Sequence, residues 1–220
     1  MRRSIQVFEN SGLLVETLAG ECASLLAGGG TAVFGGGVIP FAVCGALANH
    51  ANLYWRMIQV FPADEAFLPK GHPDRNETRL RQLLSRRPCL VQSFPTGLDP
   101  ERAAREMQKY VRRVIPFNVV VLELGAGGRM GSLAPGSPVL ESQELVDIQK
   151  GSGRNDPGRL VLTPTALSAS EKVVLCATGP GVAETLRDLE EGAKLPPLIL
   201  HPLQPVAIYA DGEAAEGMIL

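Results

Sequence analysis

One apolar run constrains the fold more than any other feature of this 220-residue chain. Residues 117–124 read FNVVVLEL, an almost uninterrupted series of β-branched and other apolar side chains. Such a run is typical of a strand buried on both faces of a parallel sheet, because helices cover both faces of such sheets. Four glycines follow within seven residues, from Gly125 to Gly131, and they predict a tight turn at the carboxyl end of this strand.

Strand-like and helix-like segments alternate along the rest of the chain. The pattern predicts strands over residues 4–8, 31–34, 57–61, 88–94, 160–162, 172–177 and 206–209. It predicts helices over residues 11–26, 41–49, 74–84, 100–114 and 180–191, with Ser11 and Asp99 as N-caps of the first and fourth. Residues 151–157 form a polar loop within the domain. We expect a single domain over residues 1–220, with an α/β fold: an open, mostly parallel Rossmann-like sheet with helices on both faces.

Composition excludes several classes of function. The formal net charge is −2, which argues against a nucleic-acid partner. The four cysteines form no C-x-x-C pair and lie among apolar residues, so we expect buried free thiols and no metal site. No apolar run approaches the ~20 residues of a membrane helix, and residues 1–3 precede no apolar signal segment. We expect an intracellular protein, in the cytoplasm or in an organelle matrix after removal of a presequence.

Two glycine-rich turns follow predicted strands, FGGGVIP at residues 34–40 and LGAGGRMG at residues 124–131. Ligands bind beyond the carboxyl ends of the strands in open α/β sheets. Successive backbone N–H groups at a helix start attract anions, so these turns could cradle a phosphate. The alternative is that the glycines only make tight turns between strands and helices, and the glycines alone favour this alternative.

Five segments together resemble the 6-phosphogluconolactonase family, within the glucosamine-6-phosphate isomerase group. FGGGVIPFAVCGALA resembles the family's LSGGSTPxxxYxxLA, and WRMIQVFPADEAFLPKGHPDRN resembles W…DERxVPxxxxxSN. DPERAAREMQKYV and FNVVVLELGAGGRMGSLAPG resemble the family's helix and its FDxxLLGxGxDGHxASLFPG segment. GRLVLTPTALSASEKVVLCATGPG resembles RxTLxxxxLxxAxxxxxLxxGxxK. The resemblance implies hydrolysis of a sugar-phosphate lactone, with the His of DGH as general base and with no metal or cofactor.

The departures from these patterns fall on the positions that the resemblance makes catalytic. Arg129 stands in place of the His of DGH, and a guanidinium does not accept a proton near neutrality. Gly127 replaces the Asp of the same motif, whereas Ser132 is retained. Glu123 replaces a glycine just before the loop, and we expect it to pair with Arg129. The other interpretation of Glu123 is a new carboxylate in the cleft.

The phosphate positions are altered as well. Gly35 replaces a serine, Val38 and Ile39 replace two hydroxyl-bearing residues, and Ala66 and Val182 replace an Arg and a Lys. These four apolar side chains predict a cleft refilled with hydrocarbon. The family positions that remain are Gly36, Gly37, Asp64, Glu65, Asn76 and Arg159.

Other residues could restore the lost anion binding or the lost base. Arg75, Arg129 and Arg159 could form a rebuilt anion site, because guanidinium groups suit phosphate. Pairing with a nearby carboxylate is an equally good interpretation of Arg159. His72 lies near Asp64 and Glu65 in sequence and could replace the base, although a surface loop is the better expectation for it.

Three functions follow from these positions. The first is a catalytically inactive member of the family, retained as a structural or interaction subunit with other protein subunits as partners. The second is an active 6-phosphogluconolactonase of the pentose phosphate pathway with a relocated base. The third is a sensor that binds a sugar phosphate or another anion without turnover. The loss of the base and of the phosphate-binding cations favours the first.

Overall fold

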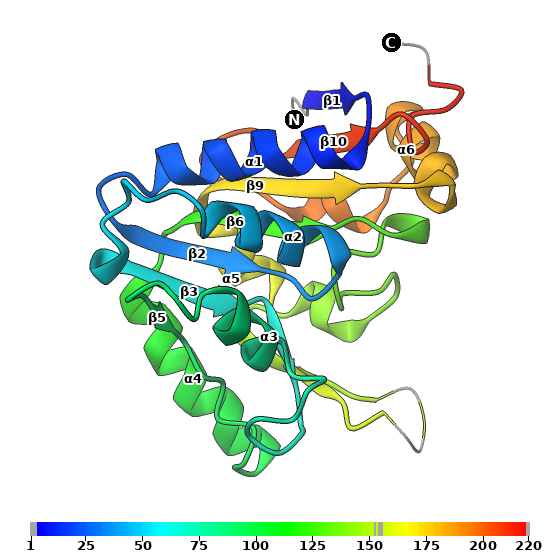
Figure 1. Ribbon diagram of the computed structural model, residues 1–220. Coiled ribbons are helices and arrows are strands. Elements are labelled where there is room, and N and C mark those ends of the chain that lie inside the picture. The colour runs from blue at the N-terminus through cyan, green and yellow to red at the C-terminus, as the bar shows by residue number, and fades with distance from the viewer. Residues whose placement is uncertain (1–3, 152, 154–155, 219–220) are drawn as a thin grey trace.

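The computed structural model describes residues 4–151, 153 and 156–218. Its centre is a seven-stranded sheet with helices packed on it (Figure 1). Residues 1–3 lie outside the described residues, as do residues 152, 154 and 155 of the predicted loop 151–157. Every pair of neighbouring strands in this sheet is parallel. In spatial order the strands are β1 (Ser4–Phe8), β10 (Ala207–Asp211), β9 (Ser170–Ala177), β6 (Phe117–Glu123), β2 (Gly30–Phe34), β3 (Ile58–Pro62) and β5 (Leu90–Val91).

Helices cover both faces of this sheet, as the sequence predicts. On one face lie α1 (Ser11–Leu25), α2 (Val38–Leu47) and α3 (Asn76–Leu83), which share one buried apolar cluster with the strands. On the other face lie α4 (Pro100–Val114), α5 (Pro164–Ser168) and α6 (Ala183–Glu190), which share a second cluster. The expected open, mostly parallel α/β sheet is therefore confirmed.

Strand β6 explains why residues 117–124 are so uniformly apolar. It lies between β9 and β2, with Val120 opposite Val173 on one side and Val33 on the other. Val119 and Val121 point into the cluster beneath α1 and α2, whereas Val120 and Leu122 point into the opposite cluster. Both faces of the strand are buried, so no polar alternation is possible.

Two helix caps test the predicted helix starts. The side chain of Asp99 accepts a hydrogen bond from the N–H of Arg102 at 3.2 Å, which confirms the predicted cap of α4. The predicted cap Ser11 is wrong by one residue. Asn10 caps α1 instead, accepting from the N–H of Leu13 at 2.9 Å. Asn10 has the extended backbone of an N-cap, whereas Ser11 already lies in the helix.

A second, smaller sheet was not predicted. It contains β4 (Asp64–Ala66), β8 (Arg159–Leu162) and β7 (Val146–Gln149), paired antiparallel in that order. The hairpin of β7 and β8 projects away from the main sheet (Figure 1). Short 3₁₀ turns connect the larger elements: η1 (Trp55–Met57), η2 (Ala126–Gly128), η3 (Pro138–Glu141), η4 (Pro180–Val182) and η5 (Pro196–Ile199).

The four cysteines are free thiols, as expected. Cys22, Cys44 and Cys176 are buried, and Cys89 is half-buried. Burial raises the pKa of the Cys22 thiol to about 12, so this group stays protonated and unreactive near neutrality. Among the described residues, no helix combines the length and the apolar character that crossing a membrane requires.

Candidate functional site

A polar cavity of about 240 Å³ lies where the two glycine-rich turns meet the small sheet. It is lined by Gly36, Gly37, Asp64, Asn76, Arg129, Gly131, Ser132 and Arg159. The first turn follows β2, and the loop carrying Arg129 and Ser132 follows β6, so both come from the carboxyl ends of neighbouring parallel strands. Open α/β sheets bind their ligands at this edge.

Asp64 is the buried acidic centre of this cavity. It is 3% exposed, and its carboxylate forms an ion pair with the guanidinium of Arg159. Asn76 Nδ2 donates to the main-chain oxygen of Asp64 at 2.7 Å and to Oδ2 at 3.3 Å. Burial raises the pKa of Asp64, and hydrogen bonds from Arg159, Ser132 and Asn76 oppose that shift. Arg159 thus both pairs with a carboxylate and lines the cavity, with 35% of its side chain exposed.

Arg129 is the second cation of the cavity, and it is exposed. Its guanidinium lies over Gly125, where an added Cβ would come within 3.1 Å of Nε and Nη2. Within the described part of the chain, no hydrogen bond or ion pair engages this guanidinium. The expected ion pair with Glu123 is therefore not formed. A guanidinium has five N–H donors, and those of Arg129 are available to a ligand.

Glu123 places a carboxylate beside the cavity. Its Oε2 lies against the backbone of Gly37, where an added Cβ would overlap it. Gly37 is the N-cap of α2, and the positive end of a helix favours a nearby negative charge. Burial raises the pKa of the half-buried Glu123, and the charge of Arg129 partly opposes this.

Three of the positions that the resemblance singles out, Gly35, Gly127 and Glu65, do not line the cavity. They hold the surrounding backbone in place. The N–H of Gly35 donates to Val121 O at 2.9 Å, which joins the turn to β6. Gly127 adopts φ +64° in η2, and its N–H donates to Thr185 Oγ1 at 2.9 Å. The buried Glu65 carboxylate accepts from the N–H groups of Asn76 and Glu77 at 3.0 and 2.8 Å, which fixes the start of α3.

Arg75 does not contribute to an anion site, which corrects the expectation. Its guanidinium is buried, with 2% of the side chain exposed, and Nη2 lies 2.9 Å from Glu77 Oε2. Glu65 Oε2 is 3.4 Å from Nε, and Nη2 also donates to Phe94 O at 3.2 Å. Two internal carboxylates neutralise this guanidinium, so it is not available to a ligand.

The expected filling of the cleft with hydrocarbon is also wrong. Val38 is 78% exposed and does not line the cavity that its turn borders. Ile39, Ala66 and Val182 are buried in the protein interior, and none of the three lines the cavity. The site is therefore an open polar cavity with two guanidinium groups.

No imidazole among the described residues lines this cavity. His72 Nδ1 lies 3.8 Å from Asp74 Oδ2 on the surface, and His50 borders a different cavity next to α1. Within the described residues, no group of three or more His, Cys, Asp or Glu side chains is arranged to hold a metal ion. Two carboxylates thus lie at the cavity: Asp64, which lines it and pairs with Arg159, and Glu123, which lies against the lining residue Gly37.

Gly131 is a lining residue that the sequence analysis did not single out as part of a site. Its backbone adopts φ +54° and brings the chain against the cavity, and its N–H donates to Glu123 O at 2.9 Å. Its place as the last glycine of the glycine-rich turn LGAGGRMG was the available signal, because glycine readily adopts a left-handed backbone.

Comparison with known proteins identifies relatives of this chain. The 6-phosphogluconolactonase of Mycobacterium tuberculosis is 29% identical over 217 residues, covering 88% of each protein. That of Streptomyces coelicolor is 31% identical over 193 residues, covering 79% of this chain and 72% of the relative. The crystal structure of 6-phosphogluconolactonase from Thermotoga maritima superposes with a TM-score of 0.83 at 22% identity, covering 96% of this chain and all of the other. A sequence model of the family described as glucosamine-6-phosphate isomerases/6-phosphogluconolactonase matches residues 13–213. The chain belongs to this family.

Proposed function

We propose that this protein hydrolyses 6-phosphogluconolactone to 6-phosphogluconate. The observation that carries the proposal is an open polar cavity flanked by Arg129, Arg159 and the carboxylate of Glu123. The similarity to 6-phosphogluconolactonases over most of the chain supports the same reaction. An inactive protein was the expectation, because the base and the phosphate-binding cations of the family are replaced. The further expectation, that hydrocarbon fills the cleft, does not hold.

In this proposal, Arg129 and Arg159 bind the phosphate of the substrate. Among the described residues, no partner accepts a hydrogen bond from the guanidinium of Arg129. Arg159 donates one N–H to Asp64, and its guanidinium has further N–H donors. Guanidinium groups match phosphate oxygens in a bidentate geometry and hold them more rigidly than a lysine would. The lactone ring then lies toward Gly36 and Gly37, at the end of the cavity where Glu123 adjoins.

Glu123 acts as the general base. Its carboxylate accepts a proton from water, and the water oxygen attacks the carbonyl carbon of the lactone. The first-turn N–H groups of α2 have no intrahelical partners and can stabilise the tetrahedral oxyanion. When the intermediate collapses, the bond from the carbonyl carbon to the ring oxygen breaks. The protonated Glu123 returns its proton to that oxygen, which leaves as a hydroxyl. A raised pKa suits this role, because a base is most effective when its pKa lies near the working pH.

The test is the rate of acid release from freshly prepared 6-phosphogluconolactone. Purified protein at micromolar concentration is expected to accelerate hydrolysis well beyond the buffer rate, and Glu123→Gln is expected to abolish most of the acceleration. A wild-type rate equal to that of buffer would reject the proposed reaction.

Binding of a sugar phosphate without turnover is the second candidate. The specific observation in its favour is that Arg129 occupies the position of the family's catalytic histidine, which strengthens anion binding and removes a base. This candidate predicts that 6-phosphogluconate raises the unfolding temperature of a protein that shows no lactonase rate. An interaction with other protein subunits stays a prediction that co-purification from the native source would test.

A further inference from the structure

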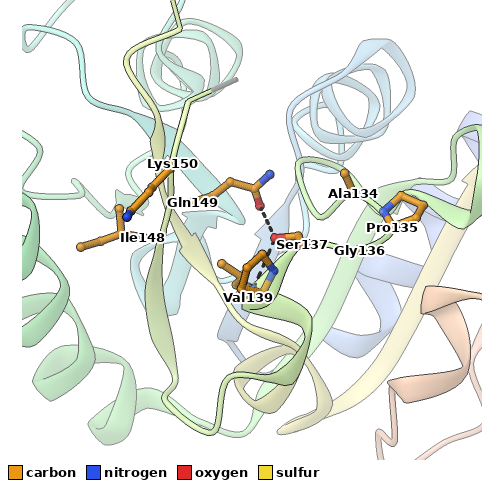
Figure 2. A pocket seen from close by; sticks show the side chains of 9 residues that line it. Ala134, Pro135, Gly136, Ser137, Val139, Ile148, Gln149 and Lys150 are labelled. Atoms are coloured by element: carbon orange, nitrogen blue, oxygen red, sulfur yellow. Dashed lines mark hydrogen bonds between the residues drawn. The ribbon is translucent and has the colours of Figure 1, made fainter. Parts of the chain in front are cut away.

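Gln149 is a polar residue near the candidate site that the proposed reaction does not use. It lies on β7 directly opposite Arg159 on β8, and residues paired in this way point to the same face of a sheet. Arg159 uses that face to reach Asp64 and the candidate site. Figure 2 shows the side chain of Gln149 on one side of β7, whereas Ile148 and Lys150 point to the opposite side. Gln149 and Arg159 are therefore neighbours on the face that carries the site.

The side chain of Gln149 shares a cavity with both guanidinium groups of the site. Gln149, Arg129 and Arg159 all line this cavity, which has a volume of about 290 Å³. Asp156 borders it as well, and its Oδ1 accepts the N–H of Gly158 at 3.0 Å. The cavity thus brings a neutral amide close to the two cations to which the proposed function assigns the phosphate.

Ser137 fixes the orientation of this amide. The two residues meet beside a further cavity of about 500 Å³, between the loop 134–139 and β7 (Figure 2). Ser137 Oγ donates to Gln149 Oε1 at 3.3 Å, and it accepts the N–H of Val139 at 3.3 Å. Since Ser137 holds the amide oxygen, the amide nitrogen is turned away from Ser137 (Figure 2). In the part of the chain that the structure describes, no acceptor takes the N–H groups of Nε2, so both are available to a ligand.

From these contacts we infer that the amide of Gln149 is a third donor to the phosphate of the substrate, and that Ser137 positions it. The inference rests on the proposed function, in which Arg129 and Arg159 hold that phosphate. The three terminal oxygens of a phosphate monoester are strong acceptors, so a third donor can engage an oxygen that the guanidinium groups leave free. A neutral donor adds this contact without a further charge.

The experiment measures the dissociation constants of 6-phosphogluconate and of inorganic phosphate by isothermal titration calorimetry. Gln149→Met removes the amide and keeps an unbranched side chain. It is expected to weaken the binding of both ligands by the same factor, roughly tenfold or more, because a hydrogen bond to a charged group is lost. Inorganic phosphate carries no sugar, so an equal factor for the two ligands identifies the phosphate as the group that Gln149 contacts.

Gln149→Glu replaces the donor with a negative charge and should have a larger effect. It is expected to weaken both ligands by at least about 100-fold, because like charges placed together repel strongly. Gln143→Glu is the matched control, since it makes the same change on an exposed glutamine that does not line the cavity. This control is expected to change both affinities by less than about twofold, because salt screens exposed charges. Thermal unfolding of each variant shows that it is folded.

Ser137 is tested through its effect on Gln149. Ser137→Ala is expected to weaken 6-phosphogluconate binding by roughly 2–10-fold, the usual effect of one neutral hydrogen bond. Ser137→Thr keeps the hydroxyl group and is expected to restore the affinity. In a Gln149→Met background, Ser137→Ala is expected to have no further effect, because no amide is left to orient. An effect of equal size in both backgrounds would show that Ser137 does not act through Gln149.

Unchanged affinities in Gln149→Met would overturn the inference, and so would a loss confined to 6-phosphogluconate. If Gln149→Met does not fold, Gln149→Glu decides by the same comparison with its control. Lactone hydrolysis tests the proposed function separately. A protein that binds 6-phosphogluconate through Gln149 without accelerating hydrolysis would uphold the inference and reject the proposed reaction. A wild-type protein that binds neither ligand would overturn both.

Discussion

The carboxylate of Glu123 lies directly against the backbone of Gly37, so that a Cβ at position 37 would overlap Oε2 and lie 3.0 Å from Cδ. This contact joins the carboxyl ends of β6 and β2, because Glu123 ends β6 and Gly37 follows β2. It brings a carboxylate to the start of α2, beside the cavity that Arg129 and Arg159 line. The position of the proposed base thus requires a glycine in the turn that follows β2.

Replacing Glu123 by Gln should reduce lactonase activity by about 10²–10⁴-fold, the usual effect of removing a general base. The wild-type rate should rise with pH as Glu123 ionises. Since burial raises its pKa, the midpoint of that rise should lie above the ordinary value of 4.5. The pH–rate profiles of both proteins check this, corrected for spontaneous hydrolysis. A Gln variant with the wild-type profile would exclude Glu123 as the base.

Glu123→Gln should lower activity, but it should raise the stability of the fold relative to wild type as the pH increases. A carboxyl group whose pKa is raised by folding contributes stability below its ordinary pKa of 4.5, and this contribution is lost as pH rises through the folded pKa. Glutamine does not ionise, so the Glu123→Gln variant does not lose this stability as the pH rises. The unfolding temperature of the variant relative to wild type should therefore increase between about pH 4 and pH 8. Thermal unfolding across this range is the measurement, and a difference independent of pH would contradict the raised pKa.

Replacing Arg129 by Gln should weaken binding of 6-phosphogluconate by roughly 10–100-fold, because a hydrogen bond to a charged group contributes about 1.5–3 kcal/mol. The unfolding temperature should change little, since within the described residues no partner engages this guanidinium. Arg112→Gln is the matched control, an exposed arginine on α4. Calorimetric titration of both variants gives the comparison, and equal affinities would remove Arg129 from the phosphate site.

Replacing Gly37 by Ala should abolish most activity and destabilise the fold. Gly37 adopts φ +139°, which side-chain-bearing residues rarely adopt, and the new Cβ would displace the Glu123 carboxylate. Gly20→Ala is the control, because Gly20 lies within α1 and has no atom within 4 Å of an added Cβ. That control should stabilise the protein by about 0.5–1 kcal/mol. Denaturant unfolding and the lactonase assay report both effects, and full activity of Gly37→Ala would separate Glu123 from catalysis.

Replacing Arg75 by Met should cost about 3–5 kcal/mol of unfolding free energy, because it leaves the buried carboxylates of Glu65 and Glu77 without their cation. Arg81 also pairs with Glu77, at 2.8 Å, but half of its side chain is exposed. Arg81→Met should therefore cost clearly less. Urea unfolding of both variants tests the difference, and equal small losses would show that the Arg75 cluster contributes little to stability.

The sequence predicted the main sheet because its inner strands are mostly apolar and buried on both faces, and because the helix α4 has a clear apolar face. Residues 117–124 and the capped helix α4 are the plainest cases. The small sheet escaped prediction because β4 has three residues, two of them acidic, and propensity gives no signal over so short a segment. Asp64 and Arg159 enter the site through this sheet. The resemblance had named both residues, although not the sheet that brings them together.

The side-chain directions at the site were harder to predict than the positions. Val38 and Ile39 are neighbours in the first turn of α2, yet one is 78% exposed and the other is buried. Their apolar character alone suggested a filled cleft, although neither side chain enters it. Likewise, a guanidinium at position 75 could be read as a ligand group, because sequence spacing does not reveal that Glu65 and Glu77 surround it.

The pairing of β4 with β8 makes the cavity sensitive to the number of residues within β8. Ala66 lies opposite Arg159 and Asp64 opposite Val161, so the Arg159–Asp64 ion pair crosses the sheet diagonally on one face. Deleting a single residue within β8 would slip this alignment by one position and turn the cation to the reverse side of the sheet. An insertion in the connection between β7 and β8 would leave the residue count of β8 unchanged, so it should preserve the alignment of Arg159 with Asp64.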